Sequence, residues 1–230
     1  MADLGTLGGT NSNGAGINNS GQVTGYSQTT GDGTSHAFLY SERVMTDLGS
    51  LGGDFSLGWG INNAGEVAGY SLTSNAVDHA FLYSRGLMND LGTLSGGAGS
   101  VAFGINDVGQ VVGESGTADG HSVHAFMYSD GQMVDLNDLI DSQSGWILVS
   151  AQAINNHGQI AGYGLLDGQL QAFLITPTVA VPEPGSYTLM LAGLSSLGFV
   201  VRRRKRDASR LDATTGPRLC LDWRCWSAVP

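Results

Sequence analysis

Histidine is the residue whose recurrence in this chain comes closest to a metal-binding or catalytic pattern. The tripeptide His-Ala-Phe begins at His36, His79 and His124, and Gln171 stands at the fourth equivalent position. Imidazole nitrogens bind zinc at about 2 Å, so a ring of these histidines could hold a metal ion. We expect them to lie too far apart to share one ion. A structural hydrogen bond, which glutamine can imitate, is the better interpretation, and we predict no metal and no cofactor.

Aspartate recurs in the same way, in the sequence Asp-Leu-Gly or a close variant. The four copies are Asp3, Asp47, Asp90 and Asp135. Such carboxylates could act as catalytic groups or calcium ligands. One aspartate per repeat at the end of a strand is more typical of an Asx turn, in which the side chain accepts hydrogen bonds from nearby backbone amides. We therefore expect a structural role.

Two further features could bind a ligand. Acid-rich loops around Asp32 and Asp119 could hold calcium weakly, but neither has an ordered ligand spacing, so we interpret them as solvated loops. Trp59 and Phe103 are aromatic residues that depart from the repeat pattern, and so is Trp146. These aromatic rings could stack on a sugar or pack in the core, and Trp59 and Phe103 are the candidate ligand-facing residues.

The sequence contains no Ser-His-Asp set, phosphate-binding loop or His-Glu-x-x-His motif. We therefore predict no catalytic residues and no enzymatic activity.

These residues recur because the chain is built from repeats. The sequence GINNSGQVTGY begins at Gly16, and related copies begin at Gly60, Gly104 and Ala153, at spacings of 44, 44 and 49 residues. Each copy predicts a strand, a tight turn at the Asn/Asp and Gly positions, and a second strand. A fixed period in this range is typical of a stacked array.

Together with the His-Ala-Phe and Asp-Leu-Gly segments, each repeat contains four predicted strands. The sequence therefore predicts an all-β fold over residues 1–176: a β-propeller-like repeat array of about four four-stranded blades. Small residues recur at alternate positions of the first strand, which suggests that it lies nearest a central axis. They are Gly14, Gly58, Ala102 and Ala151, and Gly16, Gly60, Gly104 and Ala153.

The first Asp-Leu-Gly segment has no hairpin before it, and the fourth repeat stops after Gln171-Ala172-Phe173. We expect the N-terminal strand at Asp3 to close the last blade and remove its exposed edge. The alternative, that further repeats and a secretory leader precede Met1, remains open.

Charge excludes one class of function. Residues 1–201 carry 17 acidic and two basic side chains, whereas residues 202–230 carry three acidic and eight basic ones. The acidic body would repel a phosphate backbone, so we predict no nucleic-acid partner. Both cysteines, Cys220 and Cys225, lie near the C-terminus, so the body has neither a disulfide nor thiolate chemistry.

The C-terminal part has a different character. Residues 177–185 form a predicted linker that contains Pro182, Glu183 and Pro184. An uncharged run from Ser186 to Val201 and the cluster Arg202, Arg203, Arg204, Lys205 and Arg206 predict a transmembrane helix over 186–206 with its basic end in the cytoplasm. Residues 207–230 are an expected disordered tail.

Two resemblances follow from these motifs. The repeats, with HAFLYS, DLGTLGG and GINNxGQVxGY, resemble the probable extracellular repeats of the HAF family over nearly all of residues 1–176. Residues 181–206 resemble the PEP-CTERM sorting signal of Gram-negative bacteria. That resemblance implies an exosortase, a membrane-embedded cysteine protease, that recognises Pro182, Glu183 and Pro184, while the Arg/Lys cluster stops transfer.

The resemblances imply an exported protein that is transiently anchored in the inner membrane and then released or attached at the cell surface. Such proteins are associated with exopolysaccharide and biofilm. We therefore predict a binding or matrix module of that layer. A spacer array without a ligand and a glycan-active enzyme are the alternatives.

Overall fold

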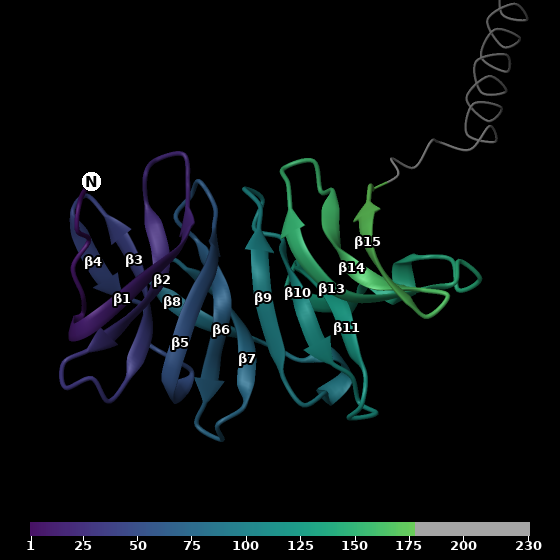
Figure 1. Cartoon of the computed structure of the whole chain (residues 1–230), viewed down its shortest axis with the longest axis horizontal. Coiled ribbons are helices and arrows are strands. Elements are labelled where there is room, and N and C mark those ends of the chain that lie inside the picture. Colours follow the sequence, from purple (N-terminus) through teal and green to yellow (C-terminus); the bar gives the residue numbers. More distant parts are fainter. Residues whose placement is uncertain (178–230) are drawn as a thin grey trace, which may run out of the picture. The chain divides into compact units, whose positions relative to one another are not determined.

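The repeats of the sequence become successive antiparallel meanders in the computed structural model, which describes residues 1–177 (Figure 1). Unit 1 contains β1 (Gly8–Ile17), β2 (Val23–Thr29), β3 (Ser35–Ser41) and β4 (Val44–Asp47). Unit 2 contains β5 (Gly52–Ile61), β6 (Val67–Thr73), β7 (Asp78–Ser84) and β8 (Leu87–Gly92). Unit 3 contains β9 (Ser100–Ile105), β10 (Val111–Gly116), β11 (Val123–Ser129) and β12 (Gln132–Asp135). Unit 4 contains β13 (Trp146–Ile154), β14 (Ile160–Leu166) and β15 (Gln169–Ile175).

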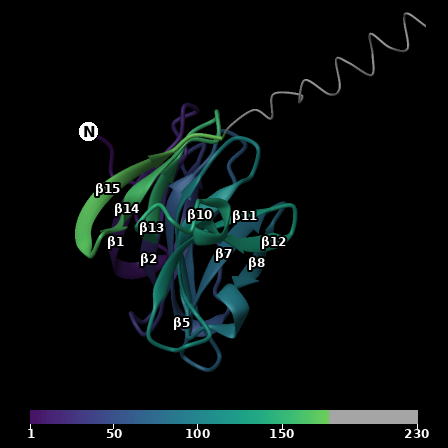
Figure 2. The same ribbon diagram turned by 90° about the vertical axis from the view of Figure 1, so that its right-hand side faces the viewer.

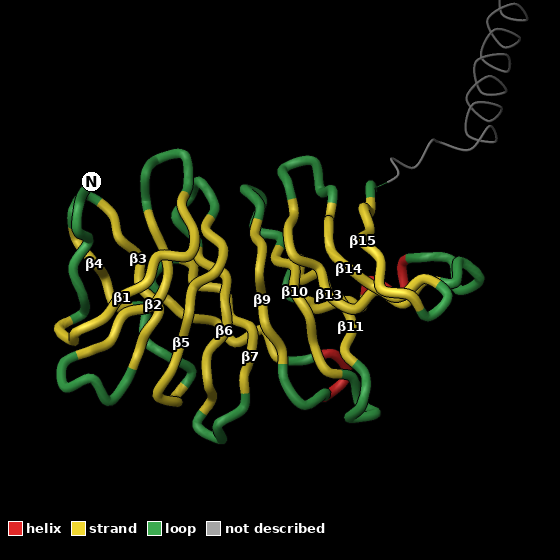
Figure 3. The backbone as a smooth tube through the Cα atoms, viewed as in Figure 1, coloured by secondary structure: helices red, strands yellow, loops and turns green. Residues whose placement is uncertain are grey.

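Strands and turns account for nearly all of the described residues (Figure 3). Two short 3-10 helices interrupt them, η1 (Leu94–Gly96) and η2 (Leu136–Leu139). The all-β prediction and the four-stranded repeat are thus confirmed for units 1 to 3. Among residues 1–177 no helix is both long and apolar enough to cross a membrane.

Each predicted tight turn is present. In unit 1 the Asn18 amide donates to the Gln22 carbonyl and the Gly21 amide to the Asn18 carbonyl, both at 3.0 Å. The glycines of the four turns have φ between 74° and 80°, a conformation that residues with a Cβ atom rarely adopt. They are Gly21, Gly65, Gly109 and Gly158.

The hydrophobic core is divided among the three contacts between successive units. One cluster, which includes Ala37, Val67 and Phe81, joins units 1 and 2. A second, which includes Ala80 and Phe126, joins units 2 and 3, and a third joins units 3 and 4. Burying one such phenylalanine contributes up to about 3 kcal/mol. A single unit lacks this burial, so the units stabilise one another.

Hydrogen bonds link the strands into three sheets. Strands β1 to β8 form an eight-stranded sheet, because Ser35 of β3 pairs in parallel with Phe55 of β5. Units 3 and 4 form a four-stranded and a three-stranded sheet. The units follow one another in chain order from β1 to β15 (Figure 1).

The described residues do not form the closed ring that the propeller prediction required. The amide of Leu7 donates to Ser27 Oγ of unit 1 at 2.9 Å, and Leu7 pairs with Thr29. Leu51 bonds to Ser71 of unit 2 in the same way. The expectation that the strand at Asp3 closes the last blade is therefore wrong, because each Asp-Leu-Gly segment also binds the unit that follows it.

The small residues of the first strands are explained by close contact between successive units and not by a central axis. A Cβ atom on Gly16 would lie 2.7 Å from the Trp59 carbonyl oxygen, and one on Gly60 would lie 3.0 Å from that of Phe103. Glycine therefore lets each unit approach the next one. In the last unit the equivalent residue is Ala153, which is exposed, so no unit within the described residues crowds it.

Candidate binding groove

The turns of the four units are joined by a row of asparagines, which we name the turn ladder: Asn18, Asn62, Asn106 and Asn155. Asn18 Nδ2 donates to the carbonyl of Asn62 at 2.9 Å, and Asn62 Nδ2 donates to that of Asn106 at 3.1 Å. Asn106 Nδ2 continues to Asn155 at 3.2 Å. The turn ladder therefore connects every unit to the next.

Each ladder asparagine also holds its own turn. Asn62 Oδ1 accepts from the amides of Ala64 and Glu66, and Nδ2 donates to Glu66 Oε2 at 2.7 Å. Asn62 is only 3% exposed. A carboxamide supplies both donors and acceptors, whereas an ionised carboxylate only accepts. This explains why asparagine occupies all four ladder positions.

A second row lies beside the turn ladder and consists of Asn19, Asn63, Asp107 and Asn156. Asp107 is its one carboxylate, and it accepts from the amide of Asn63 at 2.9 Å and from the Asn63 carboxamide at 2.8 Å. The Asn156 carboxamide donates to it at 2.7 Å. The amide and the carboxamide of Asn63 lower the pKa of Asp107. The carboxylate therefore stays ionised at neutral pH.

All residues of these two rows except Asn106 line a groove of about 260 Å³ that runs past all four units. Its apolar lining consists of the four isoleucines that precede the turns, Ile17, Ile61, Ile105 and Ile154. A strip of methyl groups beside carboxamides and one carboxylate suits a ligand with an apolar face and several hydroxyl groups.

The structure brings Trp59 and Phe103 together. Their ring centroids are 6.4 Å apart, and each precedes a groove isoleucine by two residues, on β5 and β9. Trp59 is 41% exposed. Trp146 lies elsewhere, against Phe173 at 6.3 Å in the core between units 3 and 4. The aromatic pair therefore stands close in sequence to two groove residues without lining the groove, whereas Trp146 packs in the core.

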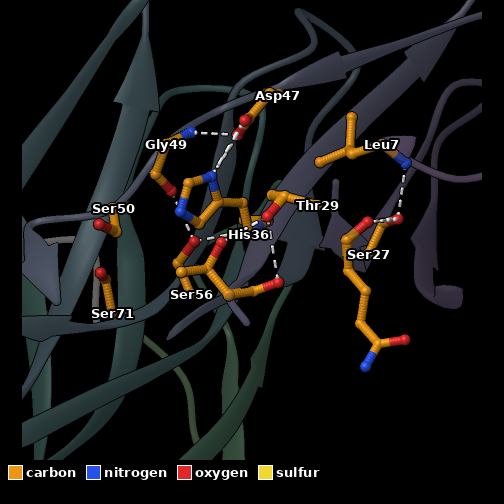
Figure 4. Close-up of polar contacts among 12 residues, drawn as sticks. Leu7, Ser27, Thr29, His36, Asp47, Gly49, Ser50, Ser56 and Ser71 are labelled. Atoms are coloured by element: carbon orange, nitrogen blue, oxygen red, sulfur yellow. Dashed lines mark hydrogen bonds and ion pairs between the residues drawn. The ribbon is translucent and has the colours of Figure 1, made fainter. Parts of the chain in front are cut away.

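The repeated histidines and aspartates form pairs within the units, as Figure 4 shows for His36 and Asp47. The distances from histidine Nδ1 to the carboxylate are 2.9 Å in unit 1, 2.8 Å for His79 and Asp90, and 2.6 Å for His124 and Asp135. The structural interpretation of the histidines is confirmed. The pairing itself was missed, although a constant separation of 11 residues could have revealed it.

The aspartates make the predicted Asx turns as well. Asp3, Asp47 and Asp90 accept from the amide of the glycine two residues later, at 2.9, 2.7 and 2.8 Å. Asp135 accepts from the amide of Asn137 at 2.8 Å. Each carboxylate in units 1 to 3 thus joins a turn to a histidine.

A serine lies near the first pair, but its hydroxyl is already bonded. Ser56 Oγ accepts from the amide of Ala37 at 2.8 Å and donates to the Gly49 carbonyl at 2.6 Å (Figure 4). In residues 1–177 no three histidine, cysteine or acidic side chains are grouped to hold a metal.

The acidic loops bind their own neighbours. Asp119 accepts hydrogen bonds from the hydroxyl of Ser122 and from that of Thr117. These bonds keep the pKa of Asp119 well below its usual range. Asp32 accepts from the amide of Thr10 at 2.8 Å.

Pro182, Glu183, Pro184 and the cluster at 202–206 lie outside the described residues, as do the predicted helix over 186–206 and the tail. No curated protein matches the chain. Residues 180–205 do match the family model of the PEP-CTERM protein-sorting motif, which confirms that part of the sequence interpretation. The motif indicates that the chain is exported and sorted at the membrane of a Gram-negative bacterium.

Proposed function

We propose that this chain is an exported binding module that holds polysaccharide of the extracellular layer in the groove beside the turn ladder. The observation that carries the proposal is the composition of the groove, in which four isoleucines lie beside six carboxamides and one carboxylate. A sugar ring presents an apolar face of C–H groups and an edge of hydroxyls, so it can contact both kinds of lining at once.

The surroundings of the groove support a neutral glycan. Trp59 is large enough to stack on a sugar ring, and its exposed fraction leaves part of the indole accessible. Asp107 is the one charged residue of the lining, and residues 1–201 carry 17 acidic but two basic side chains. An anionic polysaccharide would be repelled by this charge.

In this proposal, the sorting motif determines where the repeats are delivered. An exosortase recognises Pro182, Glu183 and Pro184, the helix over 186–206 holds the chain in the inner membrane, and the cluster from Arg202 to Arg206 stays in the cytoplasm. Cleavage then delivers the repeats to the cell surface or the matrix. The repeats are, in this proposal, members of the HAF family.

A retention assay tests the binding role. The form that the host releases would be passed over the host's own exopolysaccharide and over a panel of neutral glycans. We expect retention, and we expect Trp59→Ala to weaken it about tenfold through the loss of about 1.4 kcal/mol. Leu87→Ala is the control, because Leu87 is exposed at the start of β8 and does not line the groove. Failure of the unchanged protein to bind any glycan would contradict the proposal.

Sorting has a separate test. The double change Pro182→Ala and Glu183→Ala should leave an unprocessed chain in the membrane fraction of the host. An immunoblot of membrane and medium measures this, with Pro177→Ala as the control. Normal release of the double variant would exclude recognition of these residues.

A spacer without a ligand is the second candidate, and the saturation of the turn ladder favours it. The carboxamides of Asn18, Asn62 and Asn106 already bond within the protein. A spacer would pass the sorting test and fail the retention assay.

We also propose that the chain has no catalytic activity. The three His–Asp pairs lie in units 1, 2 and 3 instead of converging on one site, and the Ser56 hydroxyl has both its donor and an acceptor occupied. Hydrolysis of a glycan from the panel, measured as released reducing ends, would refute this.

A further inference from the structure

The outer face of unit 4 exposes positions that are buried in the other units. Ala68 and Ala80 are 0% exposed in unit 2, because unit 3 covers them. Their equivalents in unit 4, Ala161 and Ala172, are exposed. We name the unit 4 surface the terminal face; it consists of Ala161, Tyr163, Leu170, Ala172 and Leu174.

The terminal face belongs to β14 and β15, which lie on the side of the molecule that Figure 2 turns toward the viewer. Ala161 pairs with Leu174 and Tyr163 with Ala172 across these strands. Leu170 and Leu174 are 67% and 66% exposed. Contiguous exposed apolar residues of this kind mark a surface for association.

The turn ladder is also open at this end. Asn18, Asn62 and Asn106 each donate to the carbonyl of the next asparagine, whereas Asn155 Nδ2, within the described residues, donates only to Gln159. The end of the turn ladder in unit 4 therefore offers the Asn155 carboxamide as a donor, and no following carbonyl accepts from it within the described residues.

Unit 1 carries the matching surface. Unit 2 and the segment between β4 and β5 cover unit 1. The residues involved include Leu48 and Leu51 of that segment and Ile61, Val67, Phe81, Tyr83 and Met88 of unit 2. The equivalent residues at the start of the chain that are exposed or partly exposed are Leu4, Leu7, Ile17, Val23, Tyr40 and Met45, whereas Phe38 is already buried, at 1% exposure. Ile17 is 71% exposed. The first Asp-Leu-Gly segment, which does not close a ring, thus supplies the two leucines that such a junction needs.

We infer that the terminal face binds unit 1 of a second copy of this chain, head to tail. Asn155 Nδ2 would donate to the carbonyl of Asn18 in the second copy, and the Asn156 amide would donate to Asn19 Oδ1, as the Asn19 amide donates to Asn63 Oδ1 within the chain. Two terminal faces placed against each other would instead bring donors to donors. The inference goes beyond the proposed function and does not depend on a glycan.

Two residues make this junction weaker than those within the chain. Ala153 has a methyl group where Gly16, Gly60 and Gly104 let the next backbone approach. Asn13 also stands where unit 2 has the buried Leu57. We therefore expect reversible rows of copies that form at high local concentration, because a head-to-tail contact does not close on itself.

Disulfide crosslinking of the full chain on host cells tests the direction of the contact. In a Cys220→Ser, Cys225→Ser background, the pair Asn19→Cys and Asn156→Cys should give a series of covalent multimers on a non-reducing gel. The pair Asn63→Cys and Asp107→Cys, adjacent within one chain, should give a crosslinked monomer. A monomer from the first pair would overturn the inference, as would a dimer from Asn156→Cys alone, which indicates contact between two terminal faces.

A second comparison tests the face. Leu174→Lys should lower the multimer yield of the crosslinking pair at least tenfold. Leu87→Lys should leave it unchanged, because Leu87 is equally exposed, at 66%, but lies at the β7–β8 turn. An unchanged yield with Leu174→Lys, or an equal loss with both variants, would overturn the inference.

Discussion

The turn ladder and the His–Asp pairs are both repeated polar systems, yet they stabilise different levels of the structure. The ladder bonds join residues 44 or 49 positions apart and cross from one unit to the next. The His–Asp bonds join residues 11 positions apart and stay within one unit.

The difference lies in burial as well as in direction. Asn62 and Asn106 are 3% exposed, whereas the histidine side chains are 20% to 26% exposed. A buried polar group that loses its partner costs more free energy than an exposed one. The ladder should therefore contribute more to stability, and it joins each unit to the next.

The largest effect should come from Asn62→Ala. Its carboxamide holds its own turn and the turn of unit 3, so we expect a loss of about 3 kcal/mol in the free energy of unfolding, measured with urea. Asn155→Ala removes the exposed end of the ladder and should cost about 1 kcal/mol. Equal losses would show that the bonds between units contribute nothing beyond the turn.

The next largest loss of stability should come from a substitution that crowds the contact between two units. Gly16→Ala places a Cβ atom 2.7 Å from the Trp59 carbonyl oxygen, and the overpacking should cost about 2 kcal/mol. The opposite change at the equivalent site of unit 4, Ala153→Gly, should alter the free energy by less than about 1 kcal/mol. Thermal unfolding of the two variants compares them, and a tolerated Gly16→Ala would contradict the packing described here.

The His–Asp pairs should give a smaller effect. His79→Ala removes one partly exposed bond to Asp90, and we expect a loss of about 1 kcal/mol. A double-mutant cycle with Asp90→Ala should show a coupling between the two residues. The same cycle for His79 and Asp47, which belong to different pairs, should show none.

Lowering the pH should have the smallest effect on stability, and it should act through Asp107, in the row beside the turn ladder. The folded state lowers the pKa of Asp107 from its ordinary value of 3.8, so its contribution is complete above that value. The contribution is lost as the pH falls through the lower pKa of the folded state. Asp107→Asn should therefore weaken the dependence of the melting temperature on pH below about pH 4. An unchanged pH profile would exclude Asp107 as the source.

Sequence reasoning identified the repeat, the tight turns, the four-stranded unit and the Asx turns, because these depend on neighbours within a few residues. It failed on the closure of the array. The Asp-Leu-Gly segment pairs with the preceding strand through Asp47 and with the following unit through Leu51, and one sequence cannot show both partners. The groove was missed for the same reason: the asparagines were assigned to turns, and their bonds to other units depend on how the units stack.

The central claim is that the units form an open stack in chain order, and a distance between spin labels tests it most directly. Labels at Asn19→Cys and Asn156→Cys would be compared with labels at Asn63→Cys and Asp107→Cys, in a Cys220→Ser, Cys225→Ser background. Labelled chains would be diluted into unlabelled ones, so that contacts between copies do not contribute. The stack predicts a separation between units 1 and 4 that is about three times the separation of neighbouring units. Equal separations for the two pairs would mean that the units close into a ring, and would contradict the claim.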